Sequence, residues 1–433
     1  MFSRFGDIHS VSMFGHPVVV LSSLEAMSLC NFSSSDVFSH RPVWLKNVCS
    51  SITPGIIFKG SADYHNNRRF LLGSLKRRGM GKSGLEAQVL AEAEELVAHL
   101  KCFGEVDPQI IINNFTSNTI MTMCFGKRWN YNDKNYEDFS KAMDKVVDTF
   151  PLLFVEDLVP YFGYLPNIKQ AKRENADANT ILRTQFEEII TARVNGPDTE
   201  SYDDLVSDYM GNKLGKMDEA DMKNLVEICQ DMFFAGSDTT STTCNFAIIH
   251  LLNNPDWQEE VFAELNAVLQ GRHPSMTDLQ NLPKMEATIN ETLRLNPLVP
   301  LIFKANAETV KIREYTIPES TLILVNVYHI SYDPLVFPEP ASFKPCRWIG
   351  PEGKFSNELV EKVPTFGAGR RACLGRPLAR MELFLLLATL LQNFTFSLPP
   401  GAPLPSGALA GDSIAMQPPP YTLKLVARNT DDQ

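Results

Sequence analysis

The chain has 433 residues, 44% of them hydrophobic, and a formal net charge of −11 at pH 7. A negative balance of this size excludes nucleic acid as a general partner, because phosphate binding needs a basic face. The chain is longer than a usual single domain, but no linker, repeat or low-complexity tract divides it. We therefore expect one large domain over residues 1–433 that can enclose an apolar pocket.

The first predicted element is a hairpin around "FGHP" within residues 8–23. From about Ser83 onward helical periodicity dominates and predicts helices over residues 85–100, 135–150 and 175–194. The segment 151–166 is rich in Phe, Leu and Pro, so we expect it to be irregular and apolar. It belongs either to the core or to the mouth of a hydrophobic pocket.

A longer helix is predicted from Asp218 to residue 254, about 36 residues or roughly 54 Å, and the next helix ends at Gly271. A helix over 283–297, a hairpin over 313–326, a Pro-rich meander, the loop "PTFGAGRRACLGRP" and a final long helix follow. The fold class is mainly α, with a small β portion at about 1–25 and 312–330.

The eight cysteines are scattered and form no C-x-x-C pair, which argues against a zinc site or a disulfide framework and favours free thiols. No apolar run approaches the roughly 20 residues of a transmembrane helix, and the N-terminus lacks the form of a signal peptide. As given, the chain is expected to be soluble or at most peripheral.

The stretch "GAGRRA" satisfies the dinucleotide-binding pattern G-x-G-x-x-A. Such a site needs a strand directly before it and an acidic residue about 20 residues later. Pro364 interrupts the approach, and the strand-like "NFTFSLPPG" carries no acid. The dinucleotide interpretation is weak.

The same stretch fits a metal-ligand loop better. Gly367 and Gly369 allow a tight turn close to a flat ligand, and Cys373 lies at the start of a helix, where N–H groups favour a thiolate. Gly375 leaves room beside the sulfur, and Arg371 could hold a carboxylate such as a haem propionate. A lone cysteine is usually an inert buried thiol. The combination of these residues with Phe366 in F-x-x-G-x-R-x-C-x-G argues against that interpretation.

This loop resembles the haem-thiolate loop of the cytochrome P450 monooxygenases, and the resemblance extends from "FGDIHSV" to "PPPYTL". It is closest to animal microsomal members that hydroxylate steroids, fatty acids and foreign compounds. The resemblance implies a P450 fold with haem b between the long central helix and the cysteine loop, and Cys373 as the axial ligand of the iron. It also implies a monooxygenase that uses O2 on a small hydrophobic substrate.

Three further motifs carry the resemblance. The helical "ETLR" matches the family's Glu-x-x-Arg motif, which the family pairs with an arginine of the meander. In "AGSDTT" the family holds dioxygen and relays protons, and "RRFLLGSLKRRGMGK" resembles its propionate-binding helix. By this resemblance we expect a structural role for Glu291, Arg294 and Arg347, a proton relay at Asp238 and Thr239 beside Ala235, and haem contacts from Arg68 and Tyr64.

The chain departs from the family at Tyr64, where tryptophan is usual, and at Cys346, where glutamate is usual. A third departure follows "NPLVPLIF". Relatives commonly have a basic residue there for the second propionate, and this chain has Lys304 beside Ala305. Relatives also carry an N-terminal anchor and a Pro-rich hinge before the point that corresponds to Met1. The full-length protein is expected on the cytoplasmic face of the endoplasmic reticulum membrane, against the membrane surface.

The resemblance implies NADPH-cytochrome P450 reductase as the electron donor. We expect it to dock near Lys76 and Arg77, in a segment that also holds Arg68, Arg69, Arg78 and Lys82, although a solvated helix face is the simpler interpretation of most of these side chains. Two alternatives remain open. A haem-thiolate isomerase, peroxygenase or sensor would need the loop but not the relay, and a non-enzymatic helical interaction protein would bind no haem.

Overall fold

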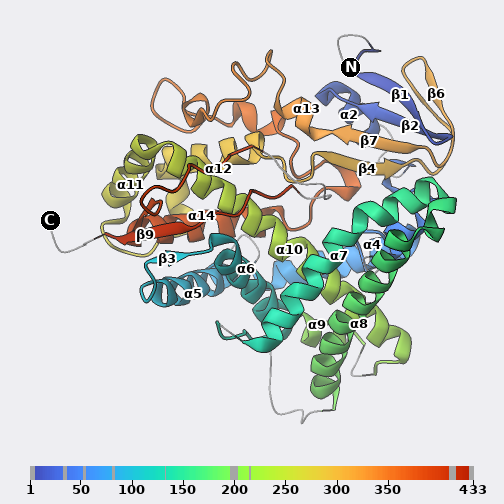
Figure 1. Ribbon diagram of the computed structural model, residues 1–433, viewed down its shortest axis with the longest axis horizontal. Helices are drawn as coiled ribbons and strands as arrows, with labels where there is room; N and C mark the ends of the chain where they lie inside the picture. Colours follow the sequence, from blue (N-terminus) through green and yellow to red (C-terminus); the bar gives the residue numbers. More distant parts are fainter. Residues whose placement is uncertain are drawn as a thin grey trace.

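The computed structural model describes residues 5–32, 37–51, 55–79, 83–131, 133–195, 203–213, 216–408 and 416–428, which are mainly helical (Figure 1). The helices are α2 (Leu24–Phe32), α3 (Lys46–Ser51), α4 (Ser61–Arg77), α5 (Ser83–Leu100), α6 (Pro108–Phe125), α7 (Lys134–Leu158), α8 (Pro166–Val194), α9 (Leu205–Asn212), α10 (Glu219–Asn253), α11 (Pro255–Leu269), α12 (Pro283–Leu295), α13 (Val327–Ser331) and α14 (Arg376–Asn393). The strands are β1 (Ile8–Met13), β2 (His16–Leu21), β3 (Glu105–Val106), β4 (Leu301–Ala305), β5 (Val310–Ile312), β6 (Tyr315–Ile317), β7 (Leu322–Asn326), β8 (Phe394–Ser397) and β9 (Leu423–Ala427).

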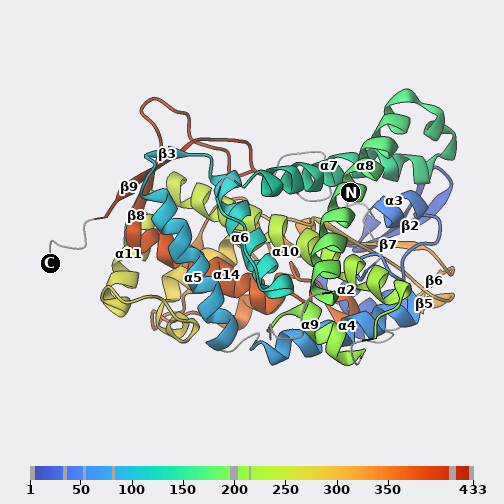
Figure 2. The same ribbon diagram turned by 90° about the horizontal axis from the view of Figure 1, so that it is seen from below.

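Helix α10 runs through the middle of the molecule, and α6, α8, α12 and α14 all pack against it (Figures 1 and 2). It begins after Asp218, whose side chain accepts the N–H of Asp221 at 2.8 Å, and spans 35 residues. At 1.5 Å per residue it is about 52 Å long. The long central helix predicted from the sequence is therefore confirmed.

The N-terminal hairpin is also confirmed. Strands β1 and β2 pair antiparallel from Ile8↔Leu21 to Met13↔His16. The turn consists of Phe14 and Gly15, both with left-handed φ angles of 50° and 91°. Two such residues fit a two-residue turn whose twist matches that of the strands.

The predicted hairpin over residues 313–326 is wrong. Strand β6 pairs with β5, whereas β7 lies between β2, to which it is parallel, and β4, to which it is antiparallel. The turn after β6 is held by Asn306, whose side chain donates to the carbonyl of Pro318 at 2.7 Å and accepts the N–H of Thr321 at 3.0 Å. The mostly buried β7 therefore joins the four-stranded sheet β1-β2-β7-β4 instead of folding back on β6.

The expectation of an irregular segment at 151–166 is wrong for its first half, because α7 continues through Pro151 to Leu158. Proline removes one helical hydrogen bond and costs about 3 kcal/mol. Here Phe150 and Leu153 are buried in the core on either side of it, and α7 packs along α8 and against α3. Tertiary packing of this kind outweighs local propensity. A 3₁₀ turn follows at Pro160–Tyr164.

Several strands lie outside the predicted β portion. Besides β4, a second sheet of order β3-β9-β8 lies near α5 and α14, at the end of the molecule opposite the N-terminal sheet (Figure 1). Strand β8 falls on the strand-like stretch that follows the last long helix. Among the described residues, none of the helices is both long enough and apolar enough to span a bilayer.

Candidate active site

The cysteine loop is a tight arch that leads into α14. The N–H of Cys373 donates to the carbonyl of Phe366 at 2.8 Å, which closes the arch. Gly367 and Gly369 have φ angles of 65° and 75°, a conformation that glycine adopts without strain. Gly375 is the residue before the first turn of α14, so Cys373 lies at the amino end of that helix. The stretch that precedes the arch is not a strand, as a dinucleotide site would require.

The environment of Cys373 acts on its thiol in two opposite directions. Its side chain is exposed, yet burial is the largest influence on the thiol and raises its pKa. A thiol that is both accessible and desolvated lines a space that is enclosed by protein. The N–H of Gly375, the charge of Arg68 and the N–H of Arg376 all act in the opposite direction and stabilise the anion. A cation or metal ion beside the sulfur would complete that stabilisation.

Gly375 also keeps the space beside the sulfur open. A Cβ atom at this position would lie 4.0 Å from the Cys373 sulfur, which is van der Waals contact. Phe366, which is partly buried, packs against the main core below the arch and carries Arg376 over its ring at 5.7 Å. The arch therefore carries no side chain at position 375, two residues after the sulfur-bearing Cys373.

Four cationic side chains lie next to the arch. Arg68 donates to the carbonyl of Ala372 at 2.9 Å, and Lys304 donates to that of Ala368 at 3.3 Å. The other two are Arg41, which donates to Phe303 O at 2.7 Å and Ile57 O at 2.9 Å, and Arg371, which donates to Ser39 O at 2.7 Å, Ile56 O at 3.0 Å and Lys59 O at 2.6 Å.

Three of these cations, Arg41, Arg371 and Lys304, lie together at an electrostatic cost. Burial lowers the pKa of Arg41 to about 10. Burial, followed by the charges of neighbouring arginines, lowers the pKa of Arg371 to about 9, and burial lowers that of Lys304 to about 8. Within the described residues, every hydrogen bond of Arg41, Arg68 and Arg371 goes to a backbone carbonyl, and none goes to a carboxylate. Buried charges need counter-charges, so the cluster fits a ligand with two carboxylates, such as the propionates of haem.

Tyr64 and Arg371 also contact each other. The guanidinium of Arg371 lies 3.4 Å above the centre of the Tyr64 ring, and the Tyr64 hydroxyl donates to the carbonyl of Arg370 at 2.6 Å. Both side chains therefore brace the arch from behind. Sequence reasoning missed Arg41, because a single arginine before a proline carries no pattern that distinguishes it.

The middle of α10 carries the second group of predicted residues. Ala235 is exposed although most of the helix around it is buried, so it faces an internal space. The hydroxyl of Thr239 donates to the carbonyl of Ala235 at 2.6 Å, the competition for the i−4 carbonyl that threonine permits. Burial, and then the charge of Asp144, raise the pKa of Asp238 to about 6. A carboxyl with this pKa can both give and take a proton near neutral pH.

Gly236, the residue after Ala235, serves close packing of two helices. A Cβ atom at this position would lie 2.5 Å from Cδ1 of Ile120, so the missing side chain allows α6 to approach α10. Ala235 and Gly236 therefore face different neighbours, because consecutive positions lie about 100° apart around the helix.

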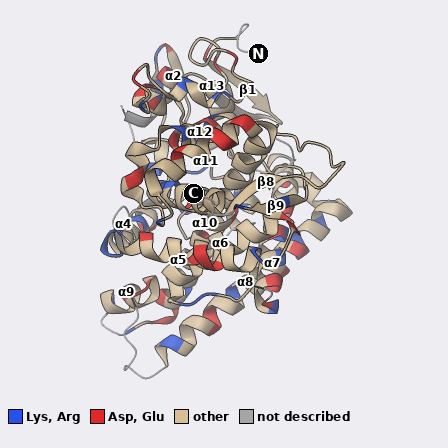
Figure 3. Ribbon diagram, turned by 90° about the vertical axis from the view of Figure 1, so that its left-hand side faces the viewer, with Lys and Arg blue, Asp and Glu red and all other residues tan. Residues whose placement is uncertain are grey.

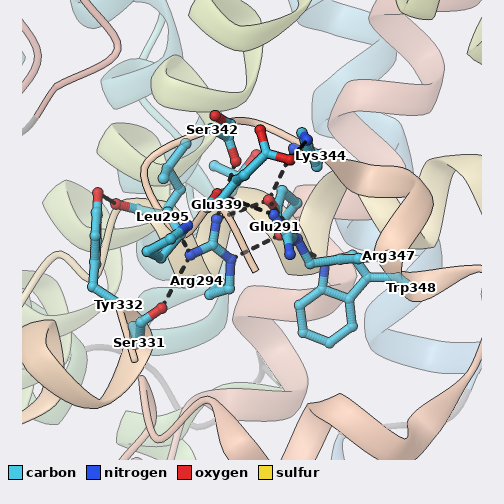
Figure 4. Close-up of polar contacts among 12 residues, drawn as sticks. Glu291, Arg294, Leu295, Ser331, Tyr332, Glu339, Ser342, Lys344, Arg347 and Trp348 are labelled. Carbon is cyan, nitrogen blue, oxygen red and sulfur yellow. Dashed lines mark hydrogen bonds and ion pairs between the residues drawn. The ribbon is translucent and has the colours of Figure 1, made fainter. Parts of the chain in front are cut away.

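The Glu-x-x-Arg pair is part of a buried network (Figure 4). Glu291 and Arg294 have fully buried side chains and form two hydrogen bonds, at 2.8 and 2.9 Å. Arg347 reaches Glu291 at 3.1 Å, and the indole N–H of Trp348 donates to Glu291 at 2.9 Å. Burial alone would raise the pKa of Glu291, but Arg294 and the N–H donors hold it below its usual value. Trp348 was missed, because tryptophan carries no charge that would suggest an ionic partner.

A cavity lies between α6, α7 and α10. It has a volume of about 100 Å³, and an adjoining hollow of about 310 Å³ lies over the α6–α7 side. Asp238 and Thr239 line the cavity together with Val299, which precedes β4. Among the described residues, no group of three or more His, Cys, Asp and Glu side chains is arranged to hold a metal ion.

Comparisons with known proteins identify relatives along nearly the whole chain. The family model described as Cytochrome P450 matches residues 1–425. The chain is 30% identical over 440 residues to cytochrome P450 2U1 of Rattus norvegicus, covering 98% of this chain and 81% of the rat protein. It is 31% identical over 446 residues to cytochrome P450 2U1 of Homo sapiens, covering 98% and 79%. It is 29% identical over 455 residues to cytochrome P450 2D9 of Mus musculus, covering 99% and 86%.

Proposed function

This chain belongs to the cytochrome P450 family, and from that premise we propose that its cofactor is haem b and that Cys373 would bind the haem iron as a thiolate. It is a haem-iron monooxygenase related to animal microsomal members. The observation that carries the proposal is the accessible Cys373 sulfur at the amino end of α14, beside Arg41 and Arg68, whose hydrogen bonds within the described residues all go to backbone carbonyls. The experiment that tests it is the replacement of Cys373 by serine.

The residues around the arch divide into three roles. Arg41, Arg68 and Lys304 would receive the haem propionates. Arg371 and Tyr64 would brace the arch that carries Cys373, together with Phe366. Gly367 and Gly369 would form its turns, and Gly375 and Ala235 would leave room for the cofactor. Bound haem supplies the redox iron at which dioxygen is reduced.

The reaction inserts one oxygen atom of O2 into a hydrophobic substrate, and two electrons and two protons convert the other atom to water. Asp238 and Thr239 are the proposed catalytic residues. Asp238, with a pKa near 6, can pass protons from solvent toward the Thr239 hydroxyl, which lies on the same turn of α10. The surrounding protein excludes bulk water and holds the substrate beside this turn.

Replacing Thr239 by alanine is expected to uncouple O2 consumption from product formation. Without the hydroxyl the proton is delivered less often, so product formed per O2 consumed should fall by about tenfold or more while peroxide release rises. Both quantities are measured with the reconstituted enzyme. Thr239→Ser, which keeps the hydroxyl, should stay close to the wild type. Unaltered coupling in Thr239→Ala would instead favour a haem-thiolate isomerase, peroxygenase or sensor.

We propose that electrons come from the NADPH-dependent P450 reductase at the cytoplasmic face of the endoplasmic reticulum membrane. The basic segment exposes fewer unpaired positive charges than its sequence suggested. Arg78 is buried against Asp208, and Arg77 pairs with the same carboxylate at 3.1 Å. Lys76 is exposed on the last turn of α4, whereas Lys82 lies outside the described residues. Lys76 is therefore the part of the segment best suited to contact an acidic flavin domain.

Replacing Lys76 by glutamate is expected to raise the reductase concentration needed for half-maximal turnover by about threefold to tenfold, because an exposed charge mainly affects association. The effect should shrink as ionic strength rises. Lys101→Glu, an exposed change at the end of α5, is the matched control. Equal reductase dependence in both variants and the wild type would contradict docking at Lys76.

A further inference from the structure

Asp238, the proposed acid of the proton relay, is contacted by a side chain from a distant part of the sequence. In the described part of the chain, its carboxylate accepts one hydrogen bond, from the Gln417 amide to Oδ1 at 3.4 Å. An ionised carboxylate only accepts hydrogen bonds, so the amide nitrogen of Gln417 must face it. Hydrogen bonds between catalytic groups are often long in the ligand-free protein and shorten when the reacting groups assemble. Gln417 is therefore placed to orient Asp238.

The segment that carries Gln417 is fixed on both sides. The backbone N–H just before it donates to the carbonyl of Leu298 at 3.0 Å, and the hydroxyl of Tyr421 after it donates to Asn245 of α10 at 2.7 Å. Asn245 comes seven positions after Asp238, so the two lie on the same face of the helix about 10 Å apart. The four residues from 417 to 421 can span about 13 Å. The segment therefore follows this face of α10 and holds Gln417 beside Asp238.

The hydrogen bond between these two side chains joins the walls of two spaces. Asp238 lines the cavity between α6, α7 and α10, whereas Gln417 lines the adjoining hollow of about 310 Å³. Asp144, an exposed residue of α7, lines both. Most of the described residues in the wall of the hollow are polar, and a polar space of this size holds water. Asp238 is therefore linked through Gln417 to the side from which a proton can arrive.

The charged and titratable groups around Asp238 act on it in the direction opposite to Gln417. Among the described residues that line the cavity, the other titratable ones are Asp144 and Tyr136, both of α7. Burial, and then the charge of Asp144, raise the pKa of Asp238, whereas the hydrogen bond from Gln417 lowers it. Charges of both signs occur along α7 (Figure 3), but no Lys, Arg or His is among the described residues that line either space. The Gln417 amide therefore supplies the stabilisation that the ionised carboxylate receives there.

We propose that Gln417 is a positioning residue of the proton relay, and that its amide N–H holds the Asp238 carboxylate between the hollow and Thr239. The proposal rests on the proposed function and adds a residue to that same site. The held carboxylate takes a proton from water in the hollow and passes it toward the Thr239 hydroxyl, and it is ionised again after each transfer. Gln417 itself neither gives nor takes the proton, because it acts through the orientation and the charge of Asp238.

The test measures Asp238 directly in the purified holoenzyme, by infrared difference spectra recorded as a function of pH. The carboxyl band that Asp238→Asn removes reports the pKa of Asp238, which is expected at about 6 in the wild type. Gln417→Met keeps the length of the side chain but has no donor, so it should raise this pKa by about half a unit to one unit, the contribution of one hydrogen bond. Gln417→Glu replaces the donor with a second carboxylate and should raise it further.

A second readout is the share of consumed O2 that the reconstituted holoenzyme releases as peroxide, measured without an added substrate. Gln417→Met should raise this share by about twofold to tenfold, because a carboxylate that is not held in place delivers protons less often. The matched control is Gln170→Met. Gln170 also donates to a carboxylate, that of Glu174 at 2.8 Å, but on the exposed surface of α8. The control should change neither the peroxide share nor the pKa of Asp238.

The reduced, carbon monoxide-treated spectrum of each variant reports haem-thiolate ligation independently of both readouts. With a normal spectrum, an unchanged Asp238 pKa in Gln417→Met, or a peroxide share equal to that of Gln170→Met, would overturn the positioning role and leave the proposed function standing. Loss of the thiolate spectrum in Gln417→Met would also overturn it, because the residue would then support haem binding instead. Absence of that spectrum in the wild type, or an unchanged peroxide share in both Asp238→Asn and Thr239→Ala, would refute the proposed function.

Discussion

Replacing Cys373 by serine is expected to abolish monooxygenase activity and to remove the red-shifted Soret band of the reduced, carbon monoxide-treated protein. The sulfur is the atom that the amino end of α14 and the charge of Arg68 stabilise as an anion. A serine hydroxyl stays protonated under the same conditions and is a poor ligand for haem iron. The loss should therefore be complete within the sensitivity of the absorbance measurement.

The chain offers matched controls for this substitution. Cys102 and Cys346 are also exposed free cysteines, at the end of α5 and in the meander. Cys102→Ser and Cys346→Ser should retain the thiolate band, because neither thiol lies in the arch. Haem content measured after extraction separates loss of the ligand from loss of the cofactor. A Cys373→Ser protein with an unchanged band would refute the assignment of the axial ligand.

Replacing Glu291 by alanine is expected to have the largest effect on stability. The substitution would leave Arg294 buried with no exposed side-chain surface and without its carboxylate, and would also remove an acceptor from Arg347 and Trp348. Breaking a buried pair by removing one partner costs about 3–5 kcal/mol. The free energy of unfolding, measured by denaturant titration of the haem-loaded protein, should fall by about that amount.

An exposed ion pair of similar sequence spacing provides the comparison. Arg183 and Glu187 are four residues apart on α8, and their side chains are 51% and 37% exposed. Glu187→Ala should change the free energy of unfolding by less than about 1 kcal/mol. If Glu291→Ala yields no folded protein, Glu291→Gln keeps the shape and tests the charge alone, with a smaller loss expected. A change within about 1 kcal/mol of the wild type in both Glu291 variants would show that the network contributes little.

The local features of this protein could be predicted from its sequence. Each depends on residues that are close together along the chain. The arch depends on two glycines two positions apart, Gly367 and Gly369, and the ends of α10 depend on Asp218 and on the Asn254-Pro255 boundary. The hairpin at Phe14 and Gly15 depends on two residues that accept a left-handed conformation. Short-range sterics and hydrogen bonding are sufficient to specify such elements.

Tertiary structure decided the features that depend on distant partners. Helix α7 continues through Pro151 because α8 and α3 pack against this helix. Strand β7 pairs with β2 and not with β6, because the four-stranded sheet buries β7. Arg41 joins Arg371, 330 positions later in the chain, only through the packing of the loops that carry them. The periodicity of a segment indicates which face is buried, but it contains no information on which distant residue will cover that face or balance its charge.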